Sequence, residues 1–188
     1  MRRRKLQNLS IRILEKILEK SSILTNIYIA IFTKMTLNEF AMAKIPDRAN
    51  VLVIGSGSVP HTLIIIGEKT NWNVVGIDRE MRAVNKGKLM IERFGLQDNV
   101  KVKYGDGLTI NLEGYDLIVI AYGVEPKEKL VERILKDKDQ QAGLIYRTTW
   151  KIMDSIYGKE WSPKENMIKK EYNRPDFVRS ILIEGGIL

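Results

Sequence analysis

The chain has 188 residues, of which 44% are hydrophobic and 29% are charged. This length and composition predict one globular protein with a sizeable core and exclude a disordered chain. Since there is no cysteine and only one histidine, disulfides and cysteine nucleophiles are excluded, and we expect no bound metal. The formal net charge of +8 would suit an anionic partner such as RNA, although four positive charges stand together at residues 2–5.

Residues 1–48 are predicted to form a small N-terminal helical cap. Residues 6–20 carry apolar side chains at helical spacing, and residues 23–32 form a second, more apolar helix. Thr36 is placed to cap a third helix over residues 37–44. Because an amphipathic helix needs a partner surface, these helices also predict a contact with a second copy of the chain.

The same region predicts neither a signal peptide nor a membrane span. Glu15 and Glu19 interrupt the first apolar run, and no small-residue cleavage site follows it. The second apolar run, of about 10 residues, is too short to cross a bilayer. We therefore predict a cytoplasmic protein without a membrane partner.

From residue 49 onward the sequence alternates between strand and helix patterns. The predicted strands are 51–55, 73–78, 100–104, 115–120 and 143–148, and the predicted helices are 59–69, 79–94 and 126–136, the second ending at Gly95. This order is typical of an α/β protein with a Rossmann-like parallel sheet, so residues 49–188 are predicted to be one Rossmann-like domain. Residues 155–172 are predicted to be irregular and polar, and residues 177–184 to form an edge strand.

A glycine-rich loop joins the first predicted strand to the next helix. Gly55, Ser56 and Gly57 follow the strand directly, and glycines there let a ligand approach the unpaired backbone N–H groups of the helix. Asp78 ends the next strand about 20 residues later, which is the spacing of an acid that binds a ribose. The loop and Asp78 could also serve only as a turn and a helix cap, but their combination favours a nucleoside site.

The identity of the nucleoside follows from the residues around this loop. Pro60 occupies the position where a dinucleotide fold has a third glycine, and no lysine follows in P-loop spacing. These absences leave S-adenosylmethionine as the leading candidate. Asp106 after the third strand is then a candidate for the adenine amine, and Ala121 and Tyr122 after the fourth are candidates for the donor pocket.

Four stretches of the chain resemble a known family. They are residues 51–62 (VLVIGSGSVPHT), 115–121 (YDLIVIA), 125–127 (EPK) and 144–148 (LIYRT). They resemble nicotianamine synthase, especially its short archaeal relatives, over roughly residues 37–157. The chain departs from that family at Ser58-Val59-Pro60, where Pro-Leu-Pro is usual, and its helical cap is smaller.

The resemblance implies a class I methyltransferase fold and an unusual use of the donor. The family transfers the 3-amino-3-carboxypropyl group of S-adenosylmethionine to an amine and releases methylthioadenosine. It further implies that Glu39 is the acidic base, and Arg147 is a candidate for binding a substrate carboxylate. The implied partner is a small-molecule amine or amino acid.

Two other functions stay open on the sequence. The first is a methyltransferase acting on a small molecule or on RNA, although nucleic acid is not the favoured partner. The second is an inactive nucleoside-binding module. Several candidates also have structural interpretations: Tyr146 is expected in the core on the opposite face from Arg147, and His61 is expected on a helix surface.

Overall fold

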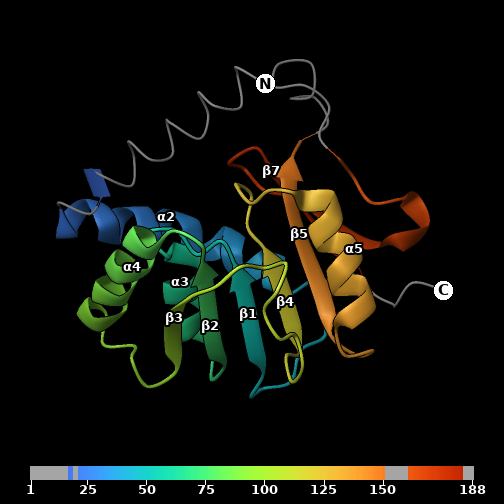
Figure 1. Ribbon diagram of the computed structural model, residues 1–188. Coiled ribbons are helices and arrows are strands. Elements are labelled where there is room, and N and C mark those ends of the chain that lie inside the picture. Colours follow the sequence, from blue (N-terminus) through green and yellow to red (C-terminus); the bar gives the residue numbers. More distant parts are fainter. Residues whose placement is uncertain (1–16, 19–20, 151–160, 184–188) are drawn as a thin grey trace, which may run out of the picture.

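The computed structural model describes residues 17–18, 21–150 and 161–183 (Figure 1). A seven-stranded sheet has the order β3-β2-β1-β4-β5-β7-β6. Its strands are β1 Asn50–Ile54, β2 Asn73–Asp78, β3 Val100–Tyr104, β4 Leu117–Ile120, β5 Gly143–Thr149, β6 Ile168–Asn173 and β7 Val178–Ile183. Strands β1 to β5 run parallel to one another, and β7 is antiparallel to both β5 and β6. The carboxyl ends of β1 to β5 therefore share one edge.

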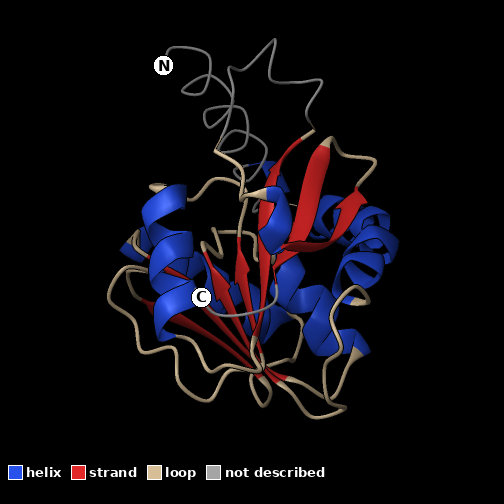
Figure 2. Ribbon diagram, turned by 90° about the vertical axis from the view of Figure 1, so that its right-hand side faces the viewer, coloured by secondary structure: helices blue, strands red, loops and turns tan. Residues whose placement is uncertain are grey.

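Helices cover both sides of this sheet (Figure 2). They are α2 Ser22–Phe40, α3 His61–Lys69, α4 Met81–Arg93 and α5 Lys127–Asp137. Apolar residues of α2, α3 and α4 form one core cluster, and those of α5 form a second cluster with the other side of the strands. Helices cover both faces of the sheet, so the strands carry apolar side chains on both faces, as is usual in parallel sheets. The α/β Rossmann-like prediction is confirmed.

The N-terminal cap differs from its prediction in one respect. Residues 22–40 form the single helix α2, so the predicted break and the cap at Thr36 are wrong. No glycine or proline interrupts this stretch, and the helix continues through Thr36, which is buried. The true N-cap is Ser21, whose Oγ accepts a hydrogen bond from the Leu24 backbone N–H at 3.3 Å. The predicted helix over residues 6–20 lies largely outside the described residues.

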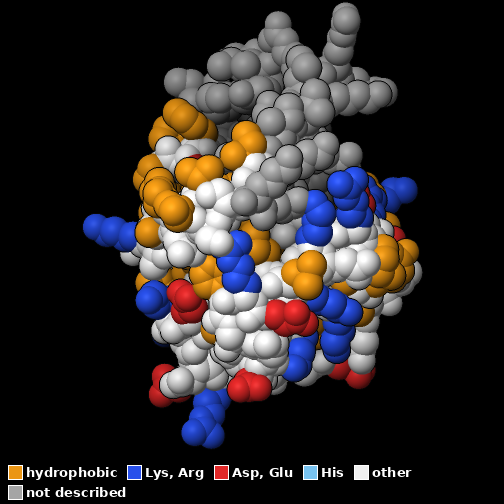
Figure 3. All heavy atoms as spheres, turned by 90° about the vertical axis from the view of Figure 1, so that its left-hand side faces the viewer, with side chains coloured by type: hydrophobic (Ala, Val, Ile, Leu, Met, Phe, Trp, Pro, Cys, Tyr) orange, Lys and Arg blue, Asp and Glu red, His pale blue; other side chains and the backbone are white. Residues whose placement is uncertain are grey.

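One side of α2 leaves apolar side chains exposed. Ile23, Ile27 and Ile31 are spaced four residues apart and are 72%, 51% and 60% exposed. Figure 3 views this side of the molecule and shows hydrophobic side chains gathered on its upper part. Contact of this surface with a second copy stays a prediction. No helix within the described residues has the length and hydropathy needed to cross a membrane.

The C-terminal strands were predicted less well than the others. Residues 168–172, which belong to the stretch predicted to be irregular, lie in the strand β6, and this strand is at the edge of the sheet. The strand β7, predicted at the edge, lies between β5 and β6. The sequence of β6 is mostly polar, and its pairing with β7 rather than an apolar pattern makes it a strand.

The close contact between α3 and β2 gives the first testable prediction. A Cβ on Gly76 would lie 2.3 Å from Leu63 Cδ2 and 3.0 Å from Ser56 Cβ. Because Leu63 is fully buried, it cannot move aside, and we expect Gly76→Ala to lower the free energy of unfolding by about 1–3 kcal/mol. Urea denaturation measures this change.

The matched control is Gly123→Ala, because a Cβ on Gly123 would meet no atom within 4 Å. This variant should unfold at nearly the wild-type urea concentration. Equal destabilisation by the two substitutions would contradict the packing described for α3 and β2.

Candidate functional site

The glycine loop lies at the carboxyl end of β1 in the conformation that its sequence predicts. Gly55 and Gly57 have φ angles of 85° and 69°, values that other residues rarely adopt. A Cβ on Gly55 would also lie 2.2 Å from Val124 Cγ2, so the loop after β4 packs directly on this glycine. Ser56 is 8% exposed, and its Oγ has no hydrogen-bond partner among the described residues. The loop therefore offers a buried hydroxyl to a ligand.

Asp78 connects this loop to the end of β2. Its Oδ2 accepts a hydrogen bond from the Gly57 N–H at 2.9 Å, and its Oδ1 accepts one from the Glu80 N–H at 2.9 Å. The second bond closes a turn between the end of β2 and the N-cap residue Glu80 of α4, and α4 itself has no side-chain cap hydrogen bond. The carboxylate is half-buried and retains lone pairs for another donor. Binding of a ribose by Asp78 stays a prediction.

The remaining donor-pocket candidates end the neighbouring strands. Asp106 is exposed, and its Oδ1 accepts a hydrogen bond from the Leu108 N–H at 2.9 Å. Ala121 donates its N–H to the Ile54 carbonyl at 3.0 Å, which holds the end of β4 beside the glycine loop. Tyr122 follows, with Lys127 Nζ 4.7 Å from its ring centroid. The structure thus brings the ends of β1, β2, β3 and β4 together as predicted for a nucleoside site.

Glu39 and Arg147 form a buried ion pair on the α2 side of the same edge. Arg147 donates from Nε to Glu39 Oε1 at 2.7 Å and from Nη2 to Oε2 at 2.6 Å. Its Nη1 donates to Thr62 Oγ1 at 3.0 Å. Thr62 lies in the first turn of α3, the helix that follows the glycine loop, so the ion pair is connected to that helix. The bidentate edge of Arg147, predicted for a substrate carboxylate, is occupied by Glu39.

Two further residues complete the surroundings of Glu39. Arg174 Nη1 donates to Oε2 at 3.0 Å, and the Ser180 hydroxyl donates to Oε1 at 2.6 Å. Burial by itself would raise the pKa of Glu39, but Arg147, Arg174 and Ser180 together outweigh it and lower the pKa. Glu39 is fully buried and stays ionised, so it is not the solvent-facing charge that a helical glutamate usually is.

Arg174 is in turn held by a carboxylate of its own turn. Its Nη2 donates to Asp176 Oδ2 at 2.8 Å, and its Nε donates to Oδ1 at 3.2 Å. Sequence reasoning missed Arg174 and Ser180, because 135 and 141 residues separate them from Glu39. The sequence Arg174-Pro175-Asp176 predicts a turn, but it does not indicate that Arg174 contacts Glu39.

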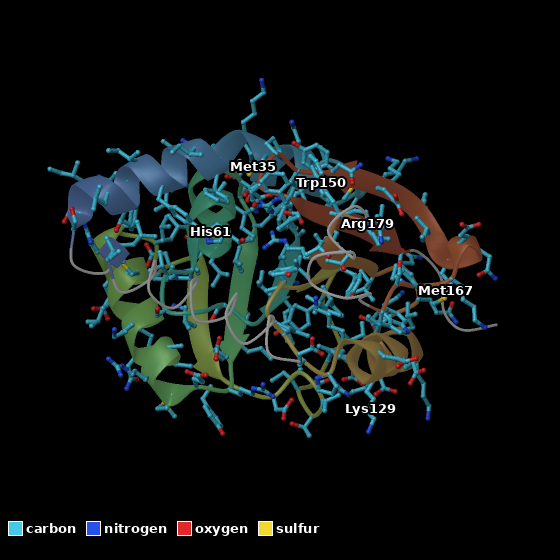
Figure 4. The ribbon with its side chains drawn as sticks, turned by 90° about the horizontal axis from the view of Figure 1, so that it is seen from above. Met35, His61, Lys129, Trp150, Met167 and Arg179 are labelled. Carbon is cyan, nitrogen blue, oxygen red and sulfur yellow. The ribbon has the colours of Figure 1, made fainter. Side chains whose placement is uncertain are left out.

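His61 lies between the ion pair and α2, and is not the surface residue that was expected. Its half-buried ring packs edge-on against Tyr28 and Phe32, at centroid distances of 5.3 and 5.2 Å. Burial, and then the positive charges of Arg147 and Arg174, lower its pKa to about 3. His61 is therefore neutral near pH 7. Figure 4 looks down on this edge and shows His61 beneath α2, with Trp150 and Arg179 on the β5–β7 side.

The described residues contain no group of three or more His, Asp or Glu side chains that could hold a metal ion. Tyr146 lies on the opposite face of β5 from Arg147 and is fully buried, as predicted. Its hydroxyl donates to the Trp161 carbonyl at 2.9 Å.

The sheet order is that of the class I methyltransferase fold. Solved structures with this fold include MtNAS, a nicotianamine synthase, which is 20% identical to the chain with a TM-score of 0.77. The match covers 92% of this chain and 69% of that one. MtNAS has been crystallised as a glutamate-to-glutamine mutant with S-adenosylmethionine and, separately, with MTA and tNA.

Other structural neighbours are methyltransferases. An S-adenosyl-L-methionine-dependent methyltransferase from Methanococcus maripaludis is 16% identical with a TM-score of 0.65, and covers 93% of both chains. An RNA methyltransferase from Salinibacter ruber, bound to S-adenosyl-L-homocysteine, is 14% identical with a TM-score of 0.64 over 82% of this chain and 94% of that one. No protein-family model matches the chain, and no curated protein matches it in sequence. At these identities the neighbours establish the fold.

The lowered pKa of His61 predicts a pH dependence of stability. The unfolded chain binds a proton at this histidine near pH 6.5, whereas the folded chain binds it only near pH 3. Below pH 6.5 the unfolded chain therefore gains a proton at His61 that the folded chain does not bind. The free energy of unfolding is unaffected by His61 above pH 6.5 and falls as the pH decreases toward 3. Between pH 6 and 4, we expect wild-type unfolding free energy to fall by about 1 kcal/mol per pH unit more than that of His61→Phe.

Urea denaturation of both proteins across this pH range measures the difference. His61→Phe keeps a ring against Tyr28 and Phe32. Glu39 is present in both proteins and stays ionised over most of the range, so a difference between the two pH profiles reports on the histidine. Parallel pH profiles would show that His61 binds protons equally in the folded and unfolded chains.

Proposed function

We propose that the chain is an S-adenosylmethionine-dependent transferase that moves the 3-amino-3-carboxypropyl group to a small amine or amino acid. The observation that carries this proposal is the Arg147 guanidinium, which joins the Glu39 carboxylate to Thr62 on the helix that follows the glycine loop. A buried carboxylate is thereby fixed beside the site where a donor would bind. The resemblance of the sequence to nicotianamine synthase and the structural likeness to MtNAS support the same reaction.

The donor would bind across the ends of β1 to β4. Gly55 and Gly57 leave room for it next to the backbone, and the unpaired Ser56 hydroxyl supplies a polar contact. Asp78 would accept hydrogen bonds from the ribose hydroxyls, and Asp106 would accept one from the adenine amine. Ala121 and Tyr122 would form the wall nearest the sulfonium. These roles are supported by the positions of the residues on successive strand ends.

The chemical step is a displacement at carbon. The lone pair of the acceptor nitrogen forms a bond to the terminal carbon of the aminocarboxypropyl group, while the bond from that carbon to sulfur breaks. The electron pair of the broken bond stays on sulfur and gives neutral methylthioadenosine. In this proposal Glu39 accepts the proton that the nitrogen loses.

A methyltransferase reaction is the alternative, and the several methyltransferases among the structural neighbours favour it. The two reactions use the same donor and differ in which carbon of the sulfonium faces the acceptor. A methyltransferase of RNA would also use the net positive charge. An inactive nucleoside-binding module is the third proposal, and any turnover would exclude it.

Product analysis separates these functions. Incubation with S-adenosylmethionine and a panel of small amines and amino acids should release methylthioadenosine, measured by liquid chromatography and mass spectrometry. Release of S-adenosylhomocysteine alone would identify a methyltransferase and contradict the proposed reaction.

The role of Glu39 is tested by Glu39→Gln, which keeps the shape of the side chain and removes its charge. We expect transfer to slow by about 100-fold or more, the scale of a lost general base, while methylthioadenosine still binds. Steady-state kinetics and calorimetry measure the two effects. Binding of methylthioadenosine shows that the variant is folded, which must be checked because the substitution leaves Arg147 without the Glu39 carboxylate and Arg174 with Asp176 alone.

Ser180→Ala is the matched control, since it removes one hydrogen bond to Glu39 and keeps the carboxylate. It should slow transfer much less than Glu39→Gln. Wild-type turnover in Glu39→Gln would remove Glu39 from the mechanism.

A further inference from the structure

The adenine candidate Asp106 lies in a segment that has no regular structure of its own. The described residues 105–116 join β3 to β4 without a helix or a strand (Figure 1). They begin with one tight turn, in which the Asp106 carbonyl accepts hydrogen bonds from the Thr109 N–H at 3.0 Å and the Ile110 N–H at 2.9 Å. An isolated turn is not stable in water, so contacts from other elements must hold Asp106 in place.

Arg133, in the middle of α5, supplies such contacts. Its Nη1 donates to the Gly107 carbonyl at 2.6 Å, and its Nη2 donates to the Ile110 carbonyl. The third nitrogen of its guanidinium, Nε, lies 3.4 Å from Asp137 Oδ2, four residues further along α5. Arg133 therefore binds both ends of the turn that starts at Asp106.

The same turn packs closely on the core. A Cβ on Gly107 would lie 2.8 Å from Ile54 Cγ2 and 3.0 Å from Leu130 Cδ1. Leu130 belongs to α5, the helix that carries Arg133, and Ile54 is the last residue of β1, directly before the glycine loop. The backbone of the turn is thereby fixed relative to the end of β1, where the donor would bind.

Asp106 also lies beside Asp78, the ribose candidate. Asp78 and Tyr104 are register partners at the ends of β2 and β3, and the Gly105 N–H donates to the Asp78 carbonyl at 3.1 Å. Neighbouring strands are about 4.8 Å apart, so one nucleoside can contact both carboxylates. The Oδ1 of Asp106 accepts a hydrogen bond from the Leu108 N–H at 2.9 Å, and the carboxylate retains lone pairs for an outside donor.

We propose that Arg133 is a positioning residue for adenine recognition, and that it enforces a preference for an amine over a carbonyl on the base by holding the Asp106 carboxylate in place. The inference rests on the proposed function, in which Asp106 accepts a hydrogen bond from the adenine amine. Arg133 acts through the two carbonyl groups of the turn. A carboxylate that is held still accepts a bond from an N–H and repels a carbonyl oxygen at the same place, whereas a mobile one can turn away.

The test compares two nucleosides that differ in one group of the base. Methylthioadenosine carries an amine where 5′-methylthioinosine carries a carbonyl oxygen, so the ratio of their calorimetric dissociation constants measures the preference for adenine. The variants are Arg133→Met, which keeps the stem and loses the guanidinium, and Arg133→Lys. A third is Asp106→Asn, whose amide can accept from an amine or donate to a carbonyl.

Asp137→Asn is the matched control. It removes the ion pair with Arg133, in which the Asp137 side chain is 42% exposed, and keeps both hydrogen bonds from Arg133 to the turn. An ion pair that is this exposed contributes little to stability. The control should therefore keep the wild-type preference.

We expect the wild-type chain to bind methylthioadenosine about 10-fold or more tightly than the inosine analogue. Asp106→Asn should remove most of this preference. Arg133→Met should lower it by about 5-fold or more, and Arg133→Lys, which can still reach one carbonyl, should restore part of it. The double variant should have the same preference as Asp106→Asn alone, because Arg133 acts through Asp106.

Two results would overturn the inference. One is a loss of affinity for both nucleosides by the same factor in Arg133→Met, which would indicate that Arg133 serves only the stability of the fold. The other is a wild-type preference in Arg133→Met. Urea denaturation shows whether each variant is folded, and the same ratio measured for Arg133→Lys decides the matter where Arg133→Met does not fold.

Failure of the proposed function gives different results. A wild-type chain that binds neither nucleoside would refute the donor site, and the inference would fall with it. Release of S-adenosylhomocysteine alone in the product analysis would refute the proposed transfer, but the adenine preference and its dependence on Arg133 would be expected unchanged.

Discussion

The buried carboxylate of Glu39 is the constraint on which the rest of the site depends. It accepts hydrogen bonds from Arg147 on β5, Arg174 in the β6–β7 turn and Ser180 on β7. Removing one partner of such a cluster leaves an uncompensated charge in the interior, which typically costs about 3–5 kcal/mol. With Asp176 on Arg174, two carboxylates face two guanidinium groups, and the cluster is neutral. These contacts hold α2, β5, β7 and the β6–β7 turn in one arrangement.

The cluster also determines how the two sides of β5 are used. Arg147 faces α2 and reaches Thr62 at the start of α3, so the position of the glycine loop is coupled to the position of Glu39. Tyr146 faces α5, and its ring centroid is 5.5 Å from Lys127 Nζ. The alternation of side chains along β5 thus directs Arg147 to the buried Glu39 and Tyr146 to the opposite core.

Much of the fold followed from local patterns in the sequence. The strands β2 and β3 begin and end where their β-branched runs predicted, and Gly95 ends α4 in the left-handed conformation that suits glycine. The strand β6 was missed because its polar residues gain their strand conformation from pairing with β7. The helix α2 was divided at Thr36 because a threonine that continues a helix cannot be told from one that caps it by its identity alone.

The site was predictable to the extent that it is local. Gly55, Ser56, Gly57 and Asp78 belong to one strand–loop–helix–strand unit, and their spacing carried the prediction. Contacts such as that of Glu39 with Arg174 join residues 135 positions apart, and no periodicity encodes them.

The central claim is that the carboxyl edge of β1 to β4 binds the adenosine of a sulfonium donor with its reactive end toward Glu39. A crystal structure with methylthioadenosine tests it most directly. The account predicts ribose hydroxyls on Asp78, adenine beside Asp106 and the thioether sulfur directed toward the α2 side where Glu39 lies. Adenosine bound away from this edge, or a sulfur directed toward β3, would contradict the account.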